Sequence, residues 1–121
     1  MAKKILVVDD SKTIREMVGH ALRRAEYEVT VACDGLEALE AINETKFELI
    51  ITDINMPNMG GIELIKNLRA DERCKVTPIL VLTTETDEGL RQEARAANAT
   101  GWIVKPFFPE KLISVVNKVI A

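Results

Sequence analysis

The stretch Ile5-Leu6-Val7-Val8-Asp9-Asp10-Ser11 decides the fold class of this chain. Its apolar run does not alternate with polar residues, which is typical of a strand buried on both faces of a parallel sheet. Ser11 is suited to cap a following helix. Downstream, apolar residues recur at the spacing of one helix face, namely Ile14, Met17, Val18, Ala21, Leu22 and Ala25. The opening therefore predicts a buried strand followed by an amphipathic helix.

The same pattern of strand then helix recurs along the rest of the chain. Further strands are predicted at 27–31, 49–51, 79–82 and 102–104, and only 27–31 alternates in polarity like an edge strand. Four further helices are predicted. The first begins at the capping-box-like Asp34-Gly35-Leu36-Glu37, and the last begins at Pro109, which suits a first helical turn. The apolar residues that mark the other two and the last are Ile62, Ile65 and Leu68; Leu90, Ala94 and Ala97; and Leu112, Val115, Val116 and Val119. This order predicts an α/β fold, a doubly wound five-stranded parallel sheet with five helices. We expect residues 1–121 to form a single domain.

Composition excludes several classes of protein. The chain has 121 residues, with 19 acidic and 16 basic ones and a net charge of −3, so it lacks the basic excess typical of nucleic-acid binding. No apolar stretch approaches the roughly 18 residues of a membrane span, and the short apolar run after Lys4 is not expected to be a signal peptide, which needs a longer one. We therefore expect a cytoplasmic protein that binds neither nucleic acid nor membranes.

A few residues are expected to have structural roles only. Cys33 and Cys74 form no CxxC pair and are expected to be free thiols. The single histidine, His20, lies off the apolar face of the first helix and is expected to be solvated. Met17, Phe47 and Phe107 are expected to pack in the core or against loops, and Met56 and Met59 to pack the loop after Asp53.

Polar side chains follow the predicted strands at the point where each strand ends. They are Asp9 and Asp10 after the first strand, Asp53 after the third, Thr83 after the fourth and Lys105 after the fifth. In a parallel sheet these ends lie along one edge, where the ligands of open α/β sheets bind. The spacing therefore predicts that these side chains form one cluster.

The residue types in this cluster indicate its chemistry. Three close carboxylates repel one another unless a cation lies between them, and oxygen ligands without His or Cys suit Mg²⁺. A metal, a lysine and a hydroxyl can balance the charge of a phosphoryl group, and an aspartate can itself be the nucleophile. Each residue taken alone is more often a cap, a turn residue or a surface charge. Their combination at four strand ends predicts a site for phosphoryl transfer.

These motifs resemble the receiver domain of two-component response regulators. The residues that match are Val7-Val8-Asp9-Asp10, Asp53 with Met56-Pro57-Asn58-Met59-Gly60-Gly61, Thr83, and Lys105-Pro106-Phe107. The resemblance covers essentially the whole chain and is greatest to stand-alone receivers of chemotaxis. It implies a flavodoxin-like sheet with strand order 2-1-3-4-5.

The resemblance also implies a role for each matching residue. Asp53 would be the phosphoacceptor, and Mg²⁺ would be bound by Asp53, by Asp10 directly, by Asp9 through water and by the backbone carbonyl of Asn55. Thr83 and Lys105 would contact the phosphoryl group, and the Lys105–Pro106 bond would be cis. Trp102 would be the aromatic switch residue coupled to Thr83. Asn55 and Glu85 would tune the lifetime of the phosphorylated state, which we expect to be seconds rather than hours.

The chain departs from the family pattern at a few positions. Gly60 stands where Asp is frequent, Ile54 where chemotaxis members often have Trp, and Thr84 is bulkier than the Ala or Gly often found there. These differences concern kinetics and the choice of partner rather than the chemistry of the site.

The resemblance implies a monomeric signalling switch that takes a phosphoryl group from a histidine kinase. Its target would be a flagellar motor switch, or a phosphotransfer protein if the chain is instead a phosphorelay intermediate. We expect it to catalyse its own phosphorylation and dephosphorylation without turnover of an external substrate. A phosphatase of the haloacid dehalogenase type is disfavoured because Asp9-Asp10-Ser11 lacks a second Asp two residues after the first. A nucleotide-binding domain is disfavoured because the chain has neither GxGxxG nor GxxxxGK[ST].

Overall fold

The chain alternates strands and helices from end to end. The computed structural model describes residues 2–83 and 88–120. The strands are β1 (Lys4–Val8), β2 (Glu28–Ala32), β3 (Leu49–Thr52), β4 (Ile79–Thr83) and β5 (Gly101–Val104). The helices are α1 (Lys12–Arg24), α2 (Gly35–Glu44), α3 (Gly61–Ala70), α4 (Glu88–Ala96) and α5 (Pro109–Ile120), with a short 3₁₀ helix at Glu72–Cys74.

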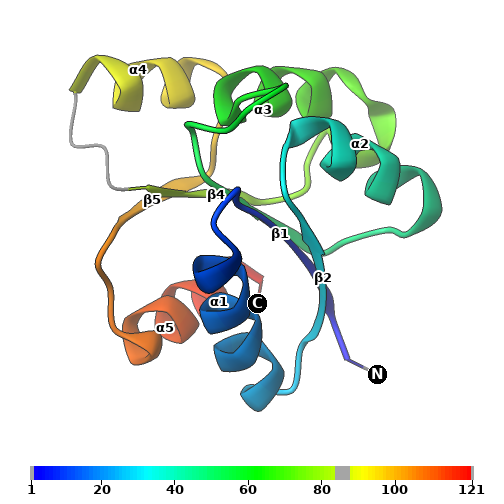
Figure 1. Ribbon diagram of the computed structural model, residues 1–121. Coiled ribbons are helices and arrows are strands. Elements are labelled where there is room, and N and C mark those ends of the chain that lie inside the picture. The colour runs from blue at the N-terminus through cyan, green and yellow to red at the C-terminus, as the bar shows by residue number, and fades with distance from the viewer. Residues whose placement is uncertain (1, 84–87, 121) are drawn as a thin grey trace.

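All five strands are parallel and form one sheet in the order β2-β1-β3-β4-β5, as predicted. Helices α2, α3 and α4 cover one face of this sheet, and α1 and α5 cover the other (Figure 1). β2 lies on one side of β1 in the sheet, and β3 to β5 follow on its other side. The direction in which strands are added therefore reverses between β1 and β3. Open sheets of this kind bind ligands beyond the carboxyl ends of the strands at such a switch point.

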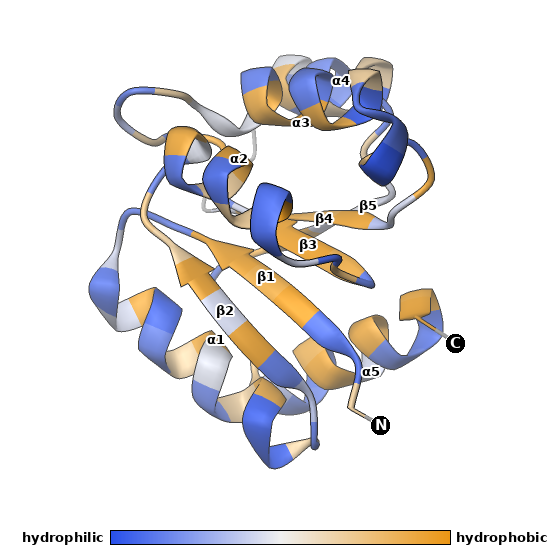
Figure 2. Cartoon of the chain, turned by 90° about the vertical axis from the view of Figure 1, so that its right-hand side faces the viewer, coloured by the Kyte–Doolittle hydropathy of each residue, from blue (hydrophilic) through white to orange (hydrophobic). Residues whose placement is uncertain are grey.

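The three inner strands β1, β3 and β4 are buried on both faces, which explains their unbroken apolar runs. One apolar layer, around Leu6, Ile50 and Val81, lies under α2, α3 and α4. The other, around Val7, Ile51 and Leu82, lies against α1 and α5. Figure 2 shows the hydrophobic strands between helices whose apolar sides face inward. Side chains alternate between the two faces along each strand, so these inner strands supply apolar residues to both layers, and their buried polar residues, Thr52 and Thr83, stand at the strand ends.

Local signals at the helix ends explain where the helices begin. The Ser11 hydroxyl accepts a hydrogen bond from the Ile14 amide at 3.3 Å, and Asp34 accepts one from the Glu37 amide at 2.9 Å. The carboxylate of Glu37 accepts from the Cys33 amide, one residue earlier than a regular capping box requires. Both predicted caps are thus confirmed, with this difference in the second.

Most of the predicted packing is confirmed, and Met17 is the exception. Phe47 is buried, while Met56, Met59 and Phe107 pack against the core. The side chain of Met17 is instead 42% exposed and lines a groove between α1 and α5. The part of α1 that contacts the sheet is narrower than its apolar stripe, because Val18, Gly19 and Leu22 alone are buried.

The remaining expectations concern the cysteines, the histidine, and the two elements with few buried residues, β2 and α4. Cys33 and Cys74 are free thiols, and His20 is exposed. The edge strand β2 is mostly exposed, and α4 buries only Ala94. Within the described residues, no helix has the length and apolar character needed to cross a membrane.

The start of α3 lies directly on the backbone that follows β3. The Gly61 amide donates to the carbonyl of Ile54 at 2.8 Å. A Cβ atom at Gly61 would lie 2.1 Å from the carbonyl oxygen of Asp53, where only a hydrogen fits. Glycine is therefore required here by close backbone approach rather than by its conformational freedom.

We predict that Gly61→Ala lowers the free energy of unfolding by about 1–3 kcal/mol, because the methyl group overpacks against backbone that cannot rotate away. Urea denaturation followed by circular dichroism measures this. Gly19→Ala is the matched control, because its Cβ would meet first the flexible end of Arg23 at 3.2 Å. Alanine favours a helix interior, so this variant should be neutral or more stable. Equal effects of the two substitutions would contradict the close approach at Gly61.

Candidate functional site

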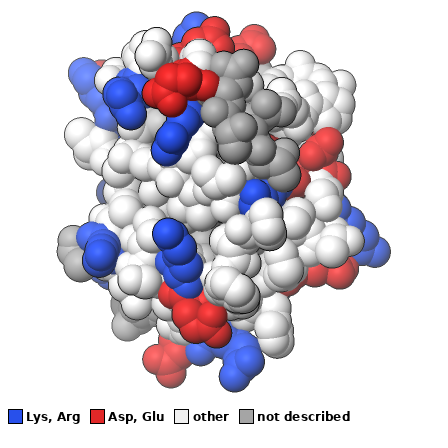
Figure 3. All heavy atoms as spheres, turned by 90° about the vertical axis from the view of Figure 1, so that its left-hand side faces the viewer, with Lys and Arg blue, Asp and Glu red and all other residues white. Residues whose placement is uncertain are grey.

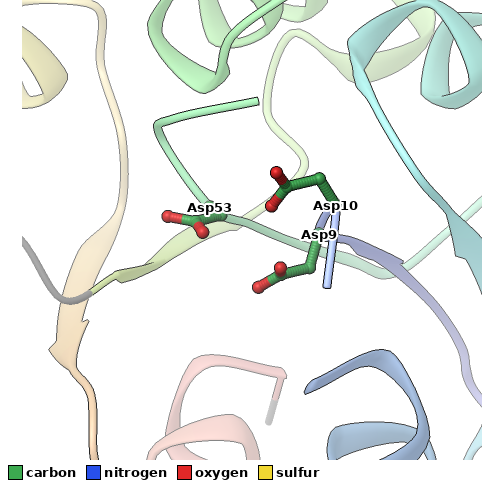
Figure 4. Close-up of side chains that lie close together, drawn as sticks. All are labelled: Asp9, Asp10 and Asp53. Carbon is green, nitrogen blue, oxygen red and sulfur yellow. The ribbon is translucent and has the colours of Figure 1, made fainter. Parts of the chain in front are cut away.

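The sheet brings two acidic strand ends together. Val8 of β1 is in register with Thr52 of β3, so the residues that follow them, Asp9 and Asp53, are neighbours across the switch point. The Asp53 amide donates to the carbonyl of Val8 at 3.0 Å, which continues the ladder by one bond. Figure 4 shows the carboxylates of Asp9, Asp10 and Asp53 directed to the same side of the ribbon.

The three carboxylates form one oxygen-rich cluster. Each offers an oxygen atom within 4.8 Å of the other two, as the positions of these residues at the strand ends predict. Their surroundings differ: Asp9 is 2% exposed, Asp10 is exposed, and the side chain of Asp53 is 12% exposed. Asp53 and Asp10 therefore face the approach from solvent, while Asp9 forms the floor of the site.

Lys105 supplies a positive charge between two of these acids. Its Nζ lies 2.8 Å from Oδ2 of Asp9 and 3.2 Å from Oδ2 of Asp53. The Lys105 amide donates to the carbonyl of Thr83, and the Lys105–Pro106 bond is cis, as the resemblance implies. The lysine therefore joins the ends of β1, β3, β4 and β5 in one cluster.

Burial and charge shift the pKa values of this pair. Burial raises the pKa of Asp9 above its ordinary 3.8, and it outweighs the hydrogen bonds from Lys105 and from the Ser11 amide, which lower this pKa. Burial lowers the pKa of Lys105, but its hydrogen bond to Asp9 and the charges of Asp53 and Asp9 raise this pKa by more. The lysine is therefore held in its charged form beside an acid that is costly to ionise.

Sequence reasoning missed two polar contacts that hold this edge in place. Arg15 of α1 donates from Nη1 to the carbonyl of Asp9 at 2.7 Å. Asn58 donates to Oδ2 of Asp34 at 2.7 Å and has a φ of 66°, a left-handed conformation that asparagine tolerates well. No periodicity marks either residue, because each acts through a contact distant in sequence. The contact of Arg15 could have been suspected from its position, because it lies in the first turns of a helix that follows two acids directly.

The loop after β3 also fixes the orientation of Asp53. Oδ1 of Asp53 accepts from the Ile54 amide at 2.7 Å, which leaves Oδ2 toward Lys105. Ile54 itself is 5% exposed and anchors the loop in the core. Asn55 follows at the exposed rim of the site.

The register of β4 and β5 relates Thr83 to Trp102. Val81 pairs with Trp102 and Thr83 pairs with Val104, so Thr83 and Trp102 project from the same face of the sheet as diagonal neighbours. Thr83 is 1% exposed. Thr84 and Glu85 lie outside the described residues.

Trp102 is partly buried under α4. The guanidinium carbon of Arg91 lies 5.4 Å from the centre of its ring. Its buried Nε1 has no hydrogen-bond partner among the described residues. An unpaired buried donor of this kind costs about 1–3 kcal/mol.

The arrangement combines three carboxylates and one lysine, with the buried Thr83 at the end of the neighbouring strand β4, and Asp10 and Asp53 are accessible to solvent. An all-oxygen donor set of this kind fits a hard divalent cation. A cation and an ammonium group together can balance the negative charge of a phosphoryl group beside Asp53. The geometry is therefore suited to phosphoryl transfer onto a carboxylate.

We predict that Lys105→Met lowers the free energy of unfolding at neutral pH in the presence of chelator by roughly 2 kcal/mol. This is less than the 3–5 kcal/mol typical of fully buried pairs, because the site opens to solvent. The folded-state pKa of Asp9 should rise further without the ammonium group. An acid with a raised folded-state pKa is stabilising when protonated, and this contribution is lost as the pH rises through that pKa. The difference in free energy of unfolding between wild type and Lys105→Met should therefore become smaller as the pH falls through the pKa of Asp9.

The double variant Lys105→Met with Asp9→Asn is the control for this prediction. Removing the acid should restore most of the lost stability, because an amide does not need the ammonium group as a counter-charge. Thermal and urea denaturation over a range of pH measure both effects. A double variant no more stable than Lys105→Met would show that charge compensation is not what Lys105 provides.

The chain is similar to known receiver domains in sequence and in fold. The response regulator receiver domain family matches residues 5–117. Chemotaxis protein CheY-3 of Vibrio cholerae is 43% identical over 117 residues, covering 96% of this chain and 90% of that protein. Chemotaxis protein CheY of Pseudomonas aeruginosa is 39% identical over 117 residues, and the match covers 96% of this chain and 94% of that protein.

Solved structures agree with this assignment. Chemotaxis response regulator CheY4 of Vibrio cholerae is 50% identical and superposes with a TM-score of 0.93, covering 98% of this chain and 99% of that one. A second structure is the receiver domain of a sensor histidine kinase from Pseudomonas aeruginosa, with a magnesium ion coordinated in its active site cleft. It is 26% identical and superposes with a TM-score of 0.92, covering 99% of this chain and 98% of that one. The chain belongs to the response regulator receiver domain family and is a phosphorylation-dependent switch of a two-component system.

Proposed function

We propose that Asp53 is the residue that accepts the phosphoryl group, and that the switch serves chemotaxis. The observation that carries the choice of Asp53 is its position: its Oδ2 lies 3.2 Å from Lys105 Nζ and its side chain is 12% exposed. Asp9 is nearly inaccessible, and its two carboxylate oxygens are bound by the Ser11 amide and by Lys105. Asp10 is exposed but makes no ion pair with a lysine or arginine in the described part of the chain. Asp53 thus combines access with a neighbouring positive charge.

The donor set supports Mg²⁺ as the metal of this site. Asp10, Asp53 and the backbone carbonyl of Asn55 would bind it directly, and Asp9 would do so through water. The cluster has oxygen ligands close enough together to share one ion, without histidine or cysteine in it. When bound, the ion offsets the charge of the carboxylates and of the incoming phosphoryl group.

The residues of the chain then have distinct roles in the transfer. A carboxylate oxygen of Asp53 attacks the phosphorus of a phosphohistidine on the kinase. A P–O bond to Asp53 forms as the P–N bond breaks, and the histidine nitrogen keeps the electron pair and takes a proton from solvent. Lys105 exchanges its contact with the Asp53 carboxylate for one with a phosphoryl oxygen. Thr83 donates its hydroxyl to another phosphoryl oxygen.

The coupling of the site to the surface is proposed to run through β4 and β5. Movement of the Thr83 side chain toward the phosphoryl group would vacate space next to Trp102, because the two project from the same face of the sheet. The ring could then shift to a second rotamer, and phosphorylation would select between two existing poses. Asn55, at the rim of the site, and Glu85 are proposed to set the lifetime of the phosphorylated state.

The partners follow from the family and from the names of the relatives. A histidine kinase is the phosphodonor, and several similar proteins are chemotaxis proteins. We propose that the chain acts in the cytoplasm as a monomeric, single receiver domain whose target is a flagellar motor switch. A phosphorelay to a phosphotransfer protein is the alternative, and a phosphorylated state that persists for hours would favour it.

We predict that acetyl phosphate with Mg²⁺ adds a single phosphoryl group to the wild-type protein and none to Asp53→Asn, because among the three clustered acids Asp53 alone combines access with a lysine neighbour. Intact-mass spectrometry measures the label. Asp71→Asn is the matched control, since Asp71 is paired with Arg73 away from the site and its loss should not change labelling. Equal labelling of wild type and Asp53→Asn would contradict the assignment.

A further inference from the structure

Helix α4 is attached to the sheet by few apolar contacts. Its buried residue is Ala94, and Leu90 is only partly buried against the core. In Figure 3 the molecule is seen from the β5 edge, with charged side chains gathered over α4 and over α5 and a band of uncharged residues between them. Contacts other than apolar burial must therefore contribute to how α4 sits on β5.

The stacking of Arg91 on Trp102 is such a contact. The guanidinium group of Arg91 lies within the distance at which a cation is attracted to an aromatic face. Within residues 2–83 and 88–120, Arg91 makes no ion pair with a carboxylate, so the indole ring is the partner that the described structure offers it. The ring in turn packs against the apolar layer below α4.

The observed pose of Trp102 is also one that the ring could leave. Its buried Nε1 lacks an acceptor in the described part of the chain, so the pose is held without a hydrogen bond from this group. A cavity of about 250 Å³ beside the ring is lined by residues that include Arg91, Arg95 and Thr100. The ring thus has an unsatisfied polar group and open space next to it.

We propose that Arg91 is a positioning residue that holds Trp102 in the observed pose and so opposes the switch. This inference rests on the proposed coupling of Asp53 to Trp102. An interaction made in one pose and lost in the other shifts the equilibrium between them by its own free energy. Loss of the stack should shift this equilibrium about two- to thirty-fold toward the other pose, the range expected for cation–π contacts from exposed to desolvated.

The test compares three variants of α4 by the fluorescence of Trp102, which is the only tryptophan of the chain. Arg91→Met keeps the apolar stem and removes the charge, Arg91→Lys keeps a cation, and Arg95→Met removes a charge that lines the same cavity without stacking on the ring. Emission and acrylamide quenching are recorded first without Mg²⁺ or phosphodonor. We expect Arg91→Met to differ from wild type, Arg91→Lys to be intermediate, and Arg95→Met to match wild type. Arg91→Met identical to wild type, or Arg91→Lys identical to Arg91→Met, would overturn the proposal.

A second measurement separates this inference from the proposed function. Each variant is titrated with beryllofluoride in the presence of Mg²⁺, and binding is followed by the same emission. If Arg91 opposes the switch, Arg91→Met should bind this phosphoryl mimic more tightly than Arg95→Met, by up to the same two- to thirty-fold. Equal affinities would overturn the role of Arg91. Failure of all variants and of wild type to respond would instead contradict the coupling of Asp53 to Trp102, while the spectra of the unliganded variants would still decide whether Arg91 holds the ring.

Discussion

The ammonium group of Lys105, between the carboxylates of Asp9 and Asp53, is the interaction on which the site depends. Two acids at neighbouring strand ends repel each other, and burial of Asp9 makes its ionisation more costly still. Contacts of 2.8 and 3.2 Å to the lysine counter this repulsion and part of the cost of burial, although the pKa of Asp9 stays raised. In the function proposed above, the lysine exchanges its contact with Asp53 for one with a phosphoryl oxygen. Lys105 is thus the counter-charge that the described residues provide for these two acids.

The sheet makes this arrangement possible because it fixes backbone positions before side chains are considered. The reversal of strand order between β1 and β3 brings Asp9 and Asp53 together, and the pairing of β4 with β5 carries Lys105 to them. Gly61 allows α3 to begin against the carbonyl of Asp53. Arg15 and Asn58 tie the surrounding turns to α1 and α2. The acids are therefore placed by the fold and held by a few polar contacts.

Much of the fold and of the site could be predicted because both depend on regular spacing. Apolar runs give the strands, and polar residues directly after them must meet at one edge of a parallel sheet. Contacts that depend on side-chain direction could not be predicted in the same way. Met17 has the spacing of a core residue, yet it lies where α1 turns from the sheet toward α5. Neither Arg15 on the Asp9 carbonyl nor Arg91 on Trp102 follows from a pattern, because each depends on how a helix is placed over the sheet.

If Lys105 acts as a built-in cation of the acidic cluster, it competes with Mg²⁺ for the same carboxylates. The most direct measurement is the Mg²⁺ affinity of Lys105→Met and wild type by isothermal titration calorimetry, with Lys118→Met, an exposed change on α5, as control. We predict that Lys105→Met binds Mg²⁺ about three- to tenfold more tightly, because one positive charge near the ion is gone. Unchanged or weaker binding in this variant would contradict the role of Lys105 as the charge that Mg²⁺ replaces.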